Sequence, residues 1–330
     1  MKPITNASPR DLAQAVTLLV EAKQQNKKAV VAGGGSDVLG MMKEQLIAPD
    51  VLVRLATIRG LDRVRQEKGG VSIGGQITLD ALSRDQTIRR QYTVLAEAAE
   101  SVATPQIRNV GTLAGNVCQR PWCWYYRNGF QCFKNGGNVC YSAAGENQFH
   151  AIFGGGPSFI VHPSDTAPAL VALDATFTIV GPQGERRVPA AEFFALPTVN
   201  ASRENVLRDD EVLASITVPP PRRNVRSMYH KVLDREAWTH AVVSAAVVME
   251  MDKDVCRSAR VVLGGVAPIP WRLPEVERML AGQPVTEALA AQAGEAAVAG
   301  ARALQHNAYK IPLTRAMVAR TIMDLTARSG

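Results

Sequence analysis

Four of the five cysteines of the chain lie close together in the sequence, at Cys118, Cys123, Cys132 and Cys140, and His150 follows them. Their spacing, C-x4-C-x8-C-x7-C and then x9-H, is neither that of a zinc finger nor that of a compact ferredoxin motif. Thiolates gathered in one stretch of a cysteine-poor chain favour metal or redox chemistry over a disulfide framework. The spacing therefore predicts a metal site of undefined type, with unrelated thiols in a long loop as the alternative.

Two short loops carry the residue types that bind phosphate groups. Gly33-Gly34-Gly35-Ser36 stands between a predicted strand and a predicted helix, where backbone N–H groups could approach an anion. It lacks the Lys-Ser/Thr pair of a Walker loop, and Val38 replaces the third glycine of the dinucleotide-binding fingerprint. A second loop, residues 107–116, combines small residues with amide and hydroxyl donors. Together the loops could hold a pyrophosphate, although each could also be an ordinary turn.

Composition and charge exclude several classes of protein. The chain has 330 residues, 46% hydrophobic and 20% charged, so it can bury a core and is not disordered. Its formal net charge is +7, but the basic residues are scattered and aromatic residues make up 5%, so we expect no nucleic-acid partner. The longest apolar stretch, Ala241–Met249, is about half of the roughly 20 residues needed to cross a bilayer. We therefore expect no membrane span and, from the polar N-terminal residues, no secretory signal.

Hydrophobic periodicity and turn residues predict the elements that position the two loops. In the first part of the chain, helices are expected at residues 12–19, 38–42, 78–84, 94–102 and 166–173, and strands at 29–32, 51–55, 71–74, 176–180, 185–188 and 211–218. Ser8 is the expected N-cap of the first helix, with Pro9 at its first position and Asp11 near the exposed amides. The stretch from residue 108 to about 156 is too irregular to form core.

The pattern changes after a polyproline break at residues 219–221, which predicts a boundary between domains 1–222 and 223–330. Beyond it, antiparallel strands are expected at 227–233, 242–251 and 255–264, and helices at 273–280, 286–301 and 313–327. Strands followed by helices are typical of a small α+β domain. Cys256 lies in one of these strands and is expected to pack as a small hydrophobe.

Three motifs, in this order, resemble the FAD-binding (medium) subunit of the molybdenum hydroxylases: Val31–Leu39, Ile107–Asn116 and His162–Leu170. That family includes xanthine dehydrogenase, carbon monoxide dehydrogenase, 4-hydroxybenzoyl-CoA reductase and the periplasmic aldehyde oxidoreductase type. The resemblance covers essentially the whole chain. It implies an α+β fold in which a two-part FAD-binding domain of the PCMH (vanillyl-alcohol oxidase-like) type precedes a small domain with a three-stranded antiparallel sheet and helices.

The resemblance also implies which residues contact FAD. They are Ala32, Gly33, Gly34, Gly35, Ser36, Asp37, Gly111, Thr112, Leu113, Ala114, Gly115, Asn116, Asp165, Leu213 and Lys231. The two loops would hold the pyrophosphate, Asp165 would hydrogen-bond a polar part of the cofactor, and Leu213 would contact the flavin ring through its backbone. A cation at Lys231 would stabilise reduced flavin. Ser36 stands where family members more often have threonine, which is a conservative change.

The cysteine stretch resembles the loop, here about residues 117–156, in which some members of the family bind a [4Fe–4S] cluster. These are the flavoprotein subunits of 4-hydroxybenzoyl-CoA reductase and of the periplasmic aldehyde oxidoreductase. The implied metal ligands are Cys123, Cys132 and Cys140, and the neighbourhood of the expected fourth ligand offers His150 instead of a cysteine. We expect His150 to be that ligand, which would raise the cluster potential, with Cys118 as the alternative.

The function implied by the resemblance is that of an oxidoreductase subunit with no catalytic residue of its own. It would take electrons from the [2Fe–2S] clusters of a small subunit, which serves a molybdopterin-binding large subunit, and pass them through FAD to an external acceptor. The three subunits would form a heterotrimer or a doubled heterotrimer. A stand-alone FAD-dependent reductase of the same fold superfamily and a zinc-stabilised binding module are the alternatives. A cytoplasmic location is expected, or a periplasmic one if a partner carries a twin-arginine signal.

Overall fold

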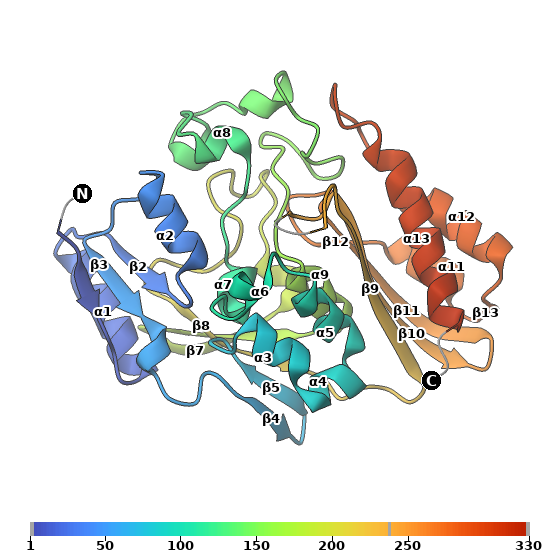
Figure 1. Cartoon of the computed structure of the whole chain (residues 1–330), viewed down its shortest axis with the longest axis horizontal. Coiled ribbons are helices and arrows are strands. Elements are labelled where there is room, and N and C mark those ends of the chain that lie inside the picture. Colours follow the sequence, from blue (N-terminus) through green and yellow to red (C-terminus); the bar gives the residue numbers. More distant parts are fainter. Residues whose placement is uncertain (1–2, 237–238, 328–330) are drawn as a thin grey trace.

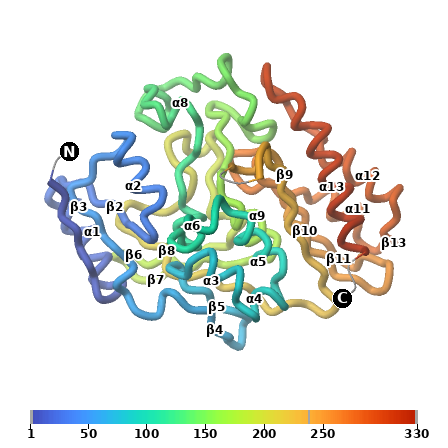
Figure 2. Tube along the Cα trace, viewed as in Figure 1, coloured from blue at the N-terminus to red at the C-terminus, as the bar shows by residue number. Residues whose placement is uncertain are grey.

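Three sheets form the framework of the chain in the computed structural model, which describes residues 3–236 and 239–327 (Figure 1). The trace passes from a small N-terminal sheet through a central antiparallel sheet to a C-terminal sheet, which carries its own layer of helices (Figure 2). The predicted α+β class is confirmed. No helix within the described ranges is both long and apolar enough to cross a membrane.

The N-terminal sheet is parallel, in the order β1-β3-β2, and positions the first glycine loop. Its strands are β1 (Thr5–Ala7), β2 (Ala29–Ala32) and β3 (Val51–Arg54), and its helices are α1 (Leu12–Gln24) and α2 (Ser36–Lys43). The predicted cap at Ser8 is wrong, because the carboxylate of Asp11 accepts a hydrogen bond from the amide of Gln14 at 2.8 Å. The helix therefore starts at Leu12, and Pro9 lies before it.

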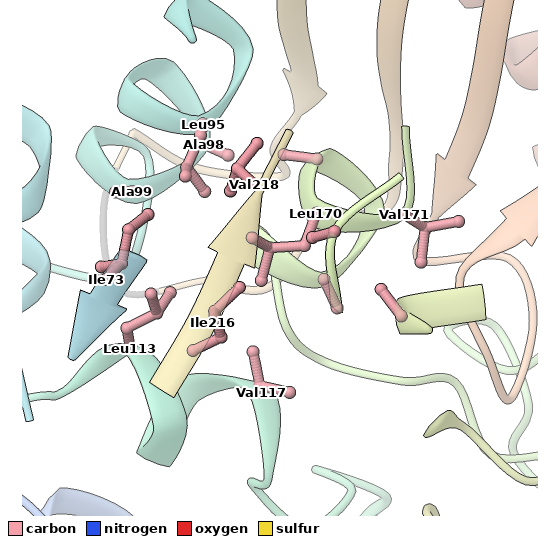
Figure 3. Close-up of a cluster of buried hydrophobic side chains, with 14 of the residues drawn as sticks. Ile73, Leu95, Ala98, Ala99, Leu113, Val117, Leu170, Val171, Ile216 and Val218 are labelled. Carbon is pink, nitrogen blue, oxygen red and sulfur yellow. The ribbon is translucent and has the colours of Figure 1, made fainter. Parts of the chain in front are cut away.

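The central sheet is antiparallel, in the order β4-β5-β8-β6-β7. Its strands are β4 (Val64–Glu67), β5 (Gly70–Gly74), β6 (Thr176–Gly181), β7 (Gly184–Pro189) and β8 (Val212–Val218). The helices of this region are α3 (Leu79–Arg84), α4 (Gln86–Gln91), α5 (Thr93–Glu100), α6 (Pro105–Arg108), α7 (Leu113–Val117), α9 (Thr166–Ala172) and α10 (Ala190–Phe193). The main core forms where Ile73 and Ile216 of the sheet meet Leu95 of α5, Leu113 of α7 and Leu170 of α9 (Figure 3).

The segment between α7 and α9 contains short helical turns and, in the described chain, no strand. These turns are α8 (Trp124–Arg127), η2 (Phe133–Asn135) and η3 (Tyr141–Ala143). The segment lies at the top of the view in Figure 1, outside the sheets. Its glycines and asparagines explain the lack of longer elements, since these residues favour turns over strands and helices.

The C-terminal sheet lies between two sets of helices. It consists of β9 (Val225–Val232), β10 (Val243–Asp252), β11 (Val255–Gly264), β12 (Trp271–Arg272) and β13 (Gln283–Pro284). Helices α11 (Pro274–Leu280), α12 (Glu287–Ala297) and α13 (Lys310–Ala327) form the outer layer, while α5 and α9 contact the sheet from the central region (Figure 1). The prediction of three strands omitted β12 and β13, because a two-residue strand has no periodicity to detect.

Alternation along β9 assigns neighbouring residues to different cores. Tyr229 belongs to the main core, whereas Met228 belongs to the core under the C-terminal helices. Cys256 is fully buried in that second core, as expected for a cysteine that packs as a small hydrophobe. The sheet therefore joins the two parts of the chain.

Acidification should destabilise the central sheet through Glu211, a buried carboxylate beside β8. Burial alone would raise the pKa of Glu211, but hydrogen bonds from Arg186 and Arg208 lower it from 4.5 to about 2. Because this pKa is lower in the folded chain, the stabilisation is complete above pH 4.5 and is lost as the pH falls toward 2. We expect a loss of about 2–3 kcal/mol in the free energy of unfolding, measured by denaturant titration at each pH. In the Glu211→Gln variant the free energy of unfolding should depend less on pH. If it falls with acidification as steeply as in the wild type, Glu211 is not the source of the acid sensitivity.

Candidate cofactor-binding site

Gly33 and Gly34 bring the loop after β2 into direct contact with the loop before α7. A Cβ atom on Gly34 would lie 1.6 Å from the carbonyl oxygen of Val110, and one on Gly33 would lie 2.5 Å from Oγ1 of Thr112. Side chains larger than hydrogen would therefore force the two loops apart. Gly35 has a φ of 79° and is the N-cap of α2, so the chain turns there in the left-handed region that favours glycine.

A cavity of about 600 Å³ opens beside these two loops. Among the predicted FAD contacts, its lining includes Ala32, Gly33, Gly34, Gly35 and Thr112. Arg54, Arg59 and Arg63 also line the cavity, together with the single carboxylate of Asp62, so the local charge suits an anion. Gln76 lines it too, and its Oε1 atom is buried with no hydrogen-bond partner within the described residues. The cavity therefore fits a phosphate-bearing ligand that also offers a hydrogen-bond donor.

The second predicted loop contributes mostly to packing. Of its predicted residues, Thr112 lines the cavity, and its Oγ1 accepts a hydrogen bond from the amide of Gly115 at 3.2 Å. A Cβ atom on Gly115 would lie 2.9 Å from that oxygen, and Gly111 sits at the other side of the turn. Leu113 and Ala114 are buried in the main core. Thr112 therefore faces the cavity, whereas the other four residues shape the loop: Gly111, Leu113, Ala114 and Gly115.

Asn116 connects the second loop to the segment that carries Asp165. It is buried, and its Oδ1 atom accepts hydrogen bonds from Ser164 Oγ at 2.6 Å and Thr166 Oγ1 at 2.7 Å. These two donors flank Asp165 in the sequence. The position of Asp165 is therefore fixed from both sides.

Asp165 is the centre of a buried polar cluster. Its Oδ1 atom accepts a hydrogen bond from the hydroxyl of Tyr229 at 2.7 Å, and its Oδ2 atom lies 2.7 Å from Nζ of Lys231. Lys231 also donates to the carbonyl oxygen of Ser101 at 3.0 Å. Burial and the charge of Asp165 raise the pKa of Tyr229, so its hydroxyl stays a donor. The structure thus brings together two predicted FAD contacts, Asp165 and Lys231, that are far apart in the sequence.

Asp37 connects α2 to the cysteine loop instead of facing the cavity. Its Oδ2 atom accepts a hydrogen bond from the amide of Arg120 at 3.0 Å, and its Oδ1 atom accepts one from Nη2 of Arg127 at 2.7 Å. The Arg127 guanidinium lies 4.2 Å from the ring centroid of Trp122, next to Cys123. Ser36 and Asp37 form the first turn of α2 and do not line the cavity. The glycine loop and the cysteine loop are therefore joined through one carboxylate.

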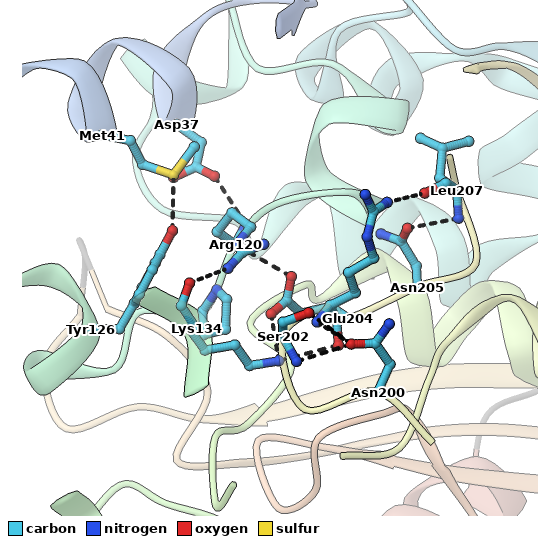
Figure 4. Close-up of polar contacts among 12 residues, drawn as sticks. Asp37, Met41, Arg120, Tyr126, Lys134, Asn200, Ser202, Glu204, Asn205 and Leu207 are labelled. Atoms are coloured by element: carbon cyan, nitrogen blue, oxygen red, sulfur yellow. Dashed lines mark hydrogen bonds and ion pairs between the residues drawn. The ribbon is translucent and has the colours of Figure 1, made fainter. Parts of the chain in front are cut away.

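A second buried ion pair fastens the cysteine loop to the segment before β8 (Figure 4). Nζ of Lys134 lies 2.8 Å from Oε1 of Glu204 and donates to the carbonyl oxygen of Arg203 at 3.1 Å. Nε of Arg120 lies 3.3 Å from Oε2 of the same glutamate. Burial lowers the pKa of Lys134, while the charge of Glu204 opposes that shift. This network holds the loop in place without a strand or a long helix.

Aromatic side chains form a small core inside the loop. The Tyr125 ring centroid lies 5.3 Å from that of Phe130 and 6.0 Å from that of Tyr141. The hydroxyl of Tyr125 accepts a hydrogen bond from the amide of Glu146 at 2.6 Å. The ring centroid of His150 lies 6.4 Å from that of Tyr125, so His150 borders this aromatic cluster.

Cys123 and His150 lie side by side in the loop. Nε2 of His150 is 3.4 Å from Sγ of Cys123, and burial together with the charge of Lys310 lowers the pKa of His150 to about 4. Burial raises the pKa of Cys123 to about 11, against the lowering effect of backbone hydrogen bonds from Tyr126 and Tyr125 and with a smaller raising effect from the charges of Cys140 and Cys132. Three of the predicted thiols and a neutral imidazole therefore lie within electrostatic range of one another. In residues 3–236 and 239–327, however, no three His, Cys, Asp or Glu side chains converge on the position of a single metal ion.

Cys118 belongs to a different environment. It follows α7, where its amide donates to Ala114, and it packs against the main core. Burial raises the pKa of Cys118 to about 12, with no charge of another cysteine among the causes. Cys118 therefore lies apart from the other three thiols of the loop.

Several residues of the site were not predicted from the sequence. Tyr229 precedes Lys231 by two positions on β9, so strand alternation alone could have placed both side chains on one face. Gln76 and Arg127 had no comparable signal, because Gln76 lines a cavity formed by several other elements and Asp37, the partner of Arg127, lies on α2. Leu213 is buried in β8. A Cβ atom on Gly75 would lie 2.8 Å from the carbonyl oxygen of Leu213, so the backbones of these two residues are close together.

Comparison with known proteins reveals similarity along nearly the whole chain. Residues 3–221 match the family described as FAD binding domain in molybdopterin dehydrogenase, and residues 228–325 match the CO dehydrogenase flavoprotein C-terminal domain. The chain is 32% identical to the aldehyde oxidoreductase FAD-binding subunit PaoB of Escherichia coli (strain K12), over 90% of this chain and 91% of that one. It is 28% identical to the carbon monoxide dehydrogenase medium chain of Hydrogenophaga pseudoflava, over 97% and 96%.

The fold is similar to that of a solved structure as well. Carbon monoxide dehydrogenase from Hydrogenophaga pseudoflava, in a form without the Mo-pyranopterin moiety of the molybdenum cofactor, superposes with a TM-score of 0.78. The superposition covers 100% of both chains at 26% sequence identity. The similarity of fold therefore extends over both the N-terminal and the C-terminal parts of the chain.

Proposed function

Because this chain belongs to the family of FAD-binding subunits of molybdenum hydroxylases, we propose that it is the flavoprotein subunit of a multi-subunit dehydrogenase of that family. It is an oxidoreductase subunit whose cofactor is FAD, and its role is electron transfer. When bound, FAD supplies the exchange of electrons between one-electron and two-electron carriers. The observation that carries this proposal is the cavity between the two glycine-containing loops, with its three arginines.

We assign different residues of the chain to different parts of FAD. Gly33 and Gly34 let backbone groups approach the pyrophosphate, whose charge is complemented by Arg54, Arg59 and Arg63. The unpartnered Oε1 of Gln76 offers an acceptor to a hydroxyl or amino group of the ligand. At the flavin end we assign Lys231, which Asp165 holds in a fixed position.

We also propose that the cysteine loop binds a [4Fe–4S] cluster through Cys123, Cys132, Cys140 and His150. A four-iron cluster takes one ligand for each iron, so its ligands lie further apart than those of a single ion. A cluster site therefore does not require three side chains to converge on one point, and in the described ranges no three do. Burial keeps the imidazole of His150 neutral, the form that can bind a metal, and this supports histidine as the fourth ligand. Nε2 of His150 lies 3.4 Å from Sγ of Cys123, so the two side chains must separate for each to bind its own iron. The packing of Cys118 against the main core argues against it in that role.

The small number of cysteines in the chain indicates which partner subunits it needs. Three of its five cysteines are assigned to the loop cluster, Cys118 packs against the main core and Cys256 lies in the second, so none is left for [2Fe–2S] centres. We infer a molybdopterin-binding large subunit and a [2Fe–2S] small subunit as partners, in a heterotrimer that can be doubled, located in the cytoplasm. Electrons would enter from the small subunit and leave to an external acceptor.

Counting cofactors on the purified complex tests both proposals. We expect about one FAD and four additional irons, with sulfide, assigned to this chain, and little zinc. Cys123→Ser and His150→Ala should each lose the loop cluster while FAD is retained, and the matched Cys118→Ser variant should keep both. FAD without the extra iron would overturn the cluster and leave the flavoprotein assignment standing. Zinc without flavin would overturn the flavoprotein assignment.

A further inference from the structure

Trp122, in the cysteine loop, is an exposed aromatic residue that is nevertheless fixed in position. Cζ of Arg127, a buried residue, lies over the indole ring, 4.2 Å from its centroid. Arg127 is itself held by Asp37, whose Oδ1 accepts from Nη2 at 2.7 Å, and by the carbonyl oxygen of Pro121, which accepts from Nε at 2.9 Å. A cation–π contact of this kind stabilises the position of an aromatic ring. The indole therefore projects from the loop as a well-fixed group.

The indole of Trp122 contacts the ring of His240, which belongs to the C-terminal part of the chain. The two ring centroids are 5.3 Å apart, with an interplanar angle of 34°. His240 lies shortly before β10, at the end of the sheet where Lys231 of β9 pairs with Ser244 of β10. Desolvation by the surrounding protein lowers the pKa of His240, the charge of Asp165 raises it, and the charge of Lys231 lowers it. His240 is therefore within electrostatic range of the ion pair between Asp165 and Lys231.

Solvent exposure increases from this ion pair toward the two rings. The side chains of Asp165 and Lys231 are only 5% and 4% exposed. His240 keeps part of its surface in contact with solvent, and Trp122 is 45% exposed. Two segments that are far apart in the sequence therefore meet on the solvent side of the ion pair, and each contributes one ring.

We propose that Trp122 and His240 shield the flavin end of the FAD site from solvent and so determine which external acceptors can touch the flavin ring. This inference rests on the FAD site proposed above and not on the cluster. Because Lys231 is assigned to the flavin end, groups on its solvent side stand between the flavin and water. Excluding water from a reactive site also excludes small solutes that would react there. The ring pair therefore disfavours small acceptors that must collide with the flavin.

Iodide quenching of flavin fluorescence in the FAD-loaded full-length chain tests the shielding. Trp122→Ala and His240→Ala each remove one ring of the pair, and each should retain FAD while the quenching constant rises severalfold. In mildly alkaline buffer neither substitution alters the net charge, because the pKa of His240 is lowered from 6.5, so the local concentration of iodide stays the same. Trp122→Phe keeps an aromatic ring and should remain close to the wild type.

Trp124→Ala is the matched control for the loss of an exposed indole. Trp124 belongs to the same loop and is 60% exposed, and its ring packs against Tyr125 at 5.3 Å and Phe130 at 5.5 Å. Its removal should leave the quenching constant unchanged. Unchanged quenching in both Trp122→Ala and His240→Ala would overturn the shielding, as would an equal rise in Trp124→Ala. His240→Ala keeps the test decisive if Trp122→Ala does not fold. A wild-type chain that binds no FAD would instead overturn the proposed function.

Discussion

Replacing Gly34 with alanine should yield a folded chain that no longer retains FAD. The added Cβ atom would lie 1.6 Å from the carbonyl oxygen of Val110, so the two loops beside the cavity must separate. Cofactor binding depends on backbone groups held within hydrogen-bond distance of the phosphates, and a shift of about 1 Å is enough to lose those bonds. We expect FAD affinity to fall roughly 100-fold or more, a loss of about 2.7 kcal/mol in binding free energy.

Gly40→Ala, in the helix α2 that follows the loop, provides the control. A Cβ atom on Gly40 meets nothing within 4 Å, so alanine should bind FAD normally and stabilise α2 by about 0.5–1 kcal/mol. Flavin absorbance per chain after gel filtration measures retention, and denaturant titration measures stability. Stoichiometric FAD in the Gly34→Ala protein would mean that the close approach of the loops is not needed for binding.

Local patterns in the sequence were enough to predict most of the fold. The strands at 29–32 and 255–264 were predicted with the bounds that the structure gives, because their runs of β-branched and apolar residues are short-range signals. β1 and β4 were missed, since a three-residue strand and a strand with the sequence VRQE offer no apolar alternation. The helix α13 begins at Lys310, three residues before the predicted start, because that lysine is buried against the loop and does not interrupt the helix.

The candidate site was predictable only where residue type alone fixes the geometry. The glycines of the first loop, which were predicted to contact FAD, line the cavity, because their backbone conformation and lack of a Cβ atom are local properties. Asp37 was predicted as an FAD contact, and the structure shows that its carboxylate accepts hydrogen bonds from the cysteine loop. That outcome depends on Arg127, 90 positions away, and no pattern near residue 37 encodes it. The contact of Lys310 with His150 spans 160 positions and was not predicted for the same reason.

Removing the carboxylate of Asp165 should cause the largest loss of stability of any single substitution in the site. Asp165 neutralises Lys231 and accepts the hydroxyl of Tyr229, and all three side chains are buried. In Asp165→Ala the ammonium of Lys231 would keep only the carbonyl of Ser101 as a partner in the described structure. An uncompensated buried charge costs about 3–5 kcal/mol, and we expect a decrease of that size in the free energy of unfolding.

The double variant Asp165→Ala with Lys231→Met separates the contribution of the ion pair to stability from its contribution to FAD binding. With both charges removed, most of the lost stability should return, because an apolar replacement of a buried ion pair is often close to neutral. Denaturant titration of the flavin-free chain gives this coupling energy without any contribution from FAD. Repeating it with FAD bound measures what the same two residues do for the cofactor. If the single and double variants are equally unstable without FAD, the ion pair is not what holds this part of the fold together. If they differ only with FAD, the pair is maintained for the cofactor and not for the fold.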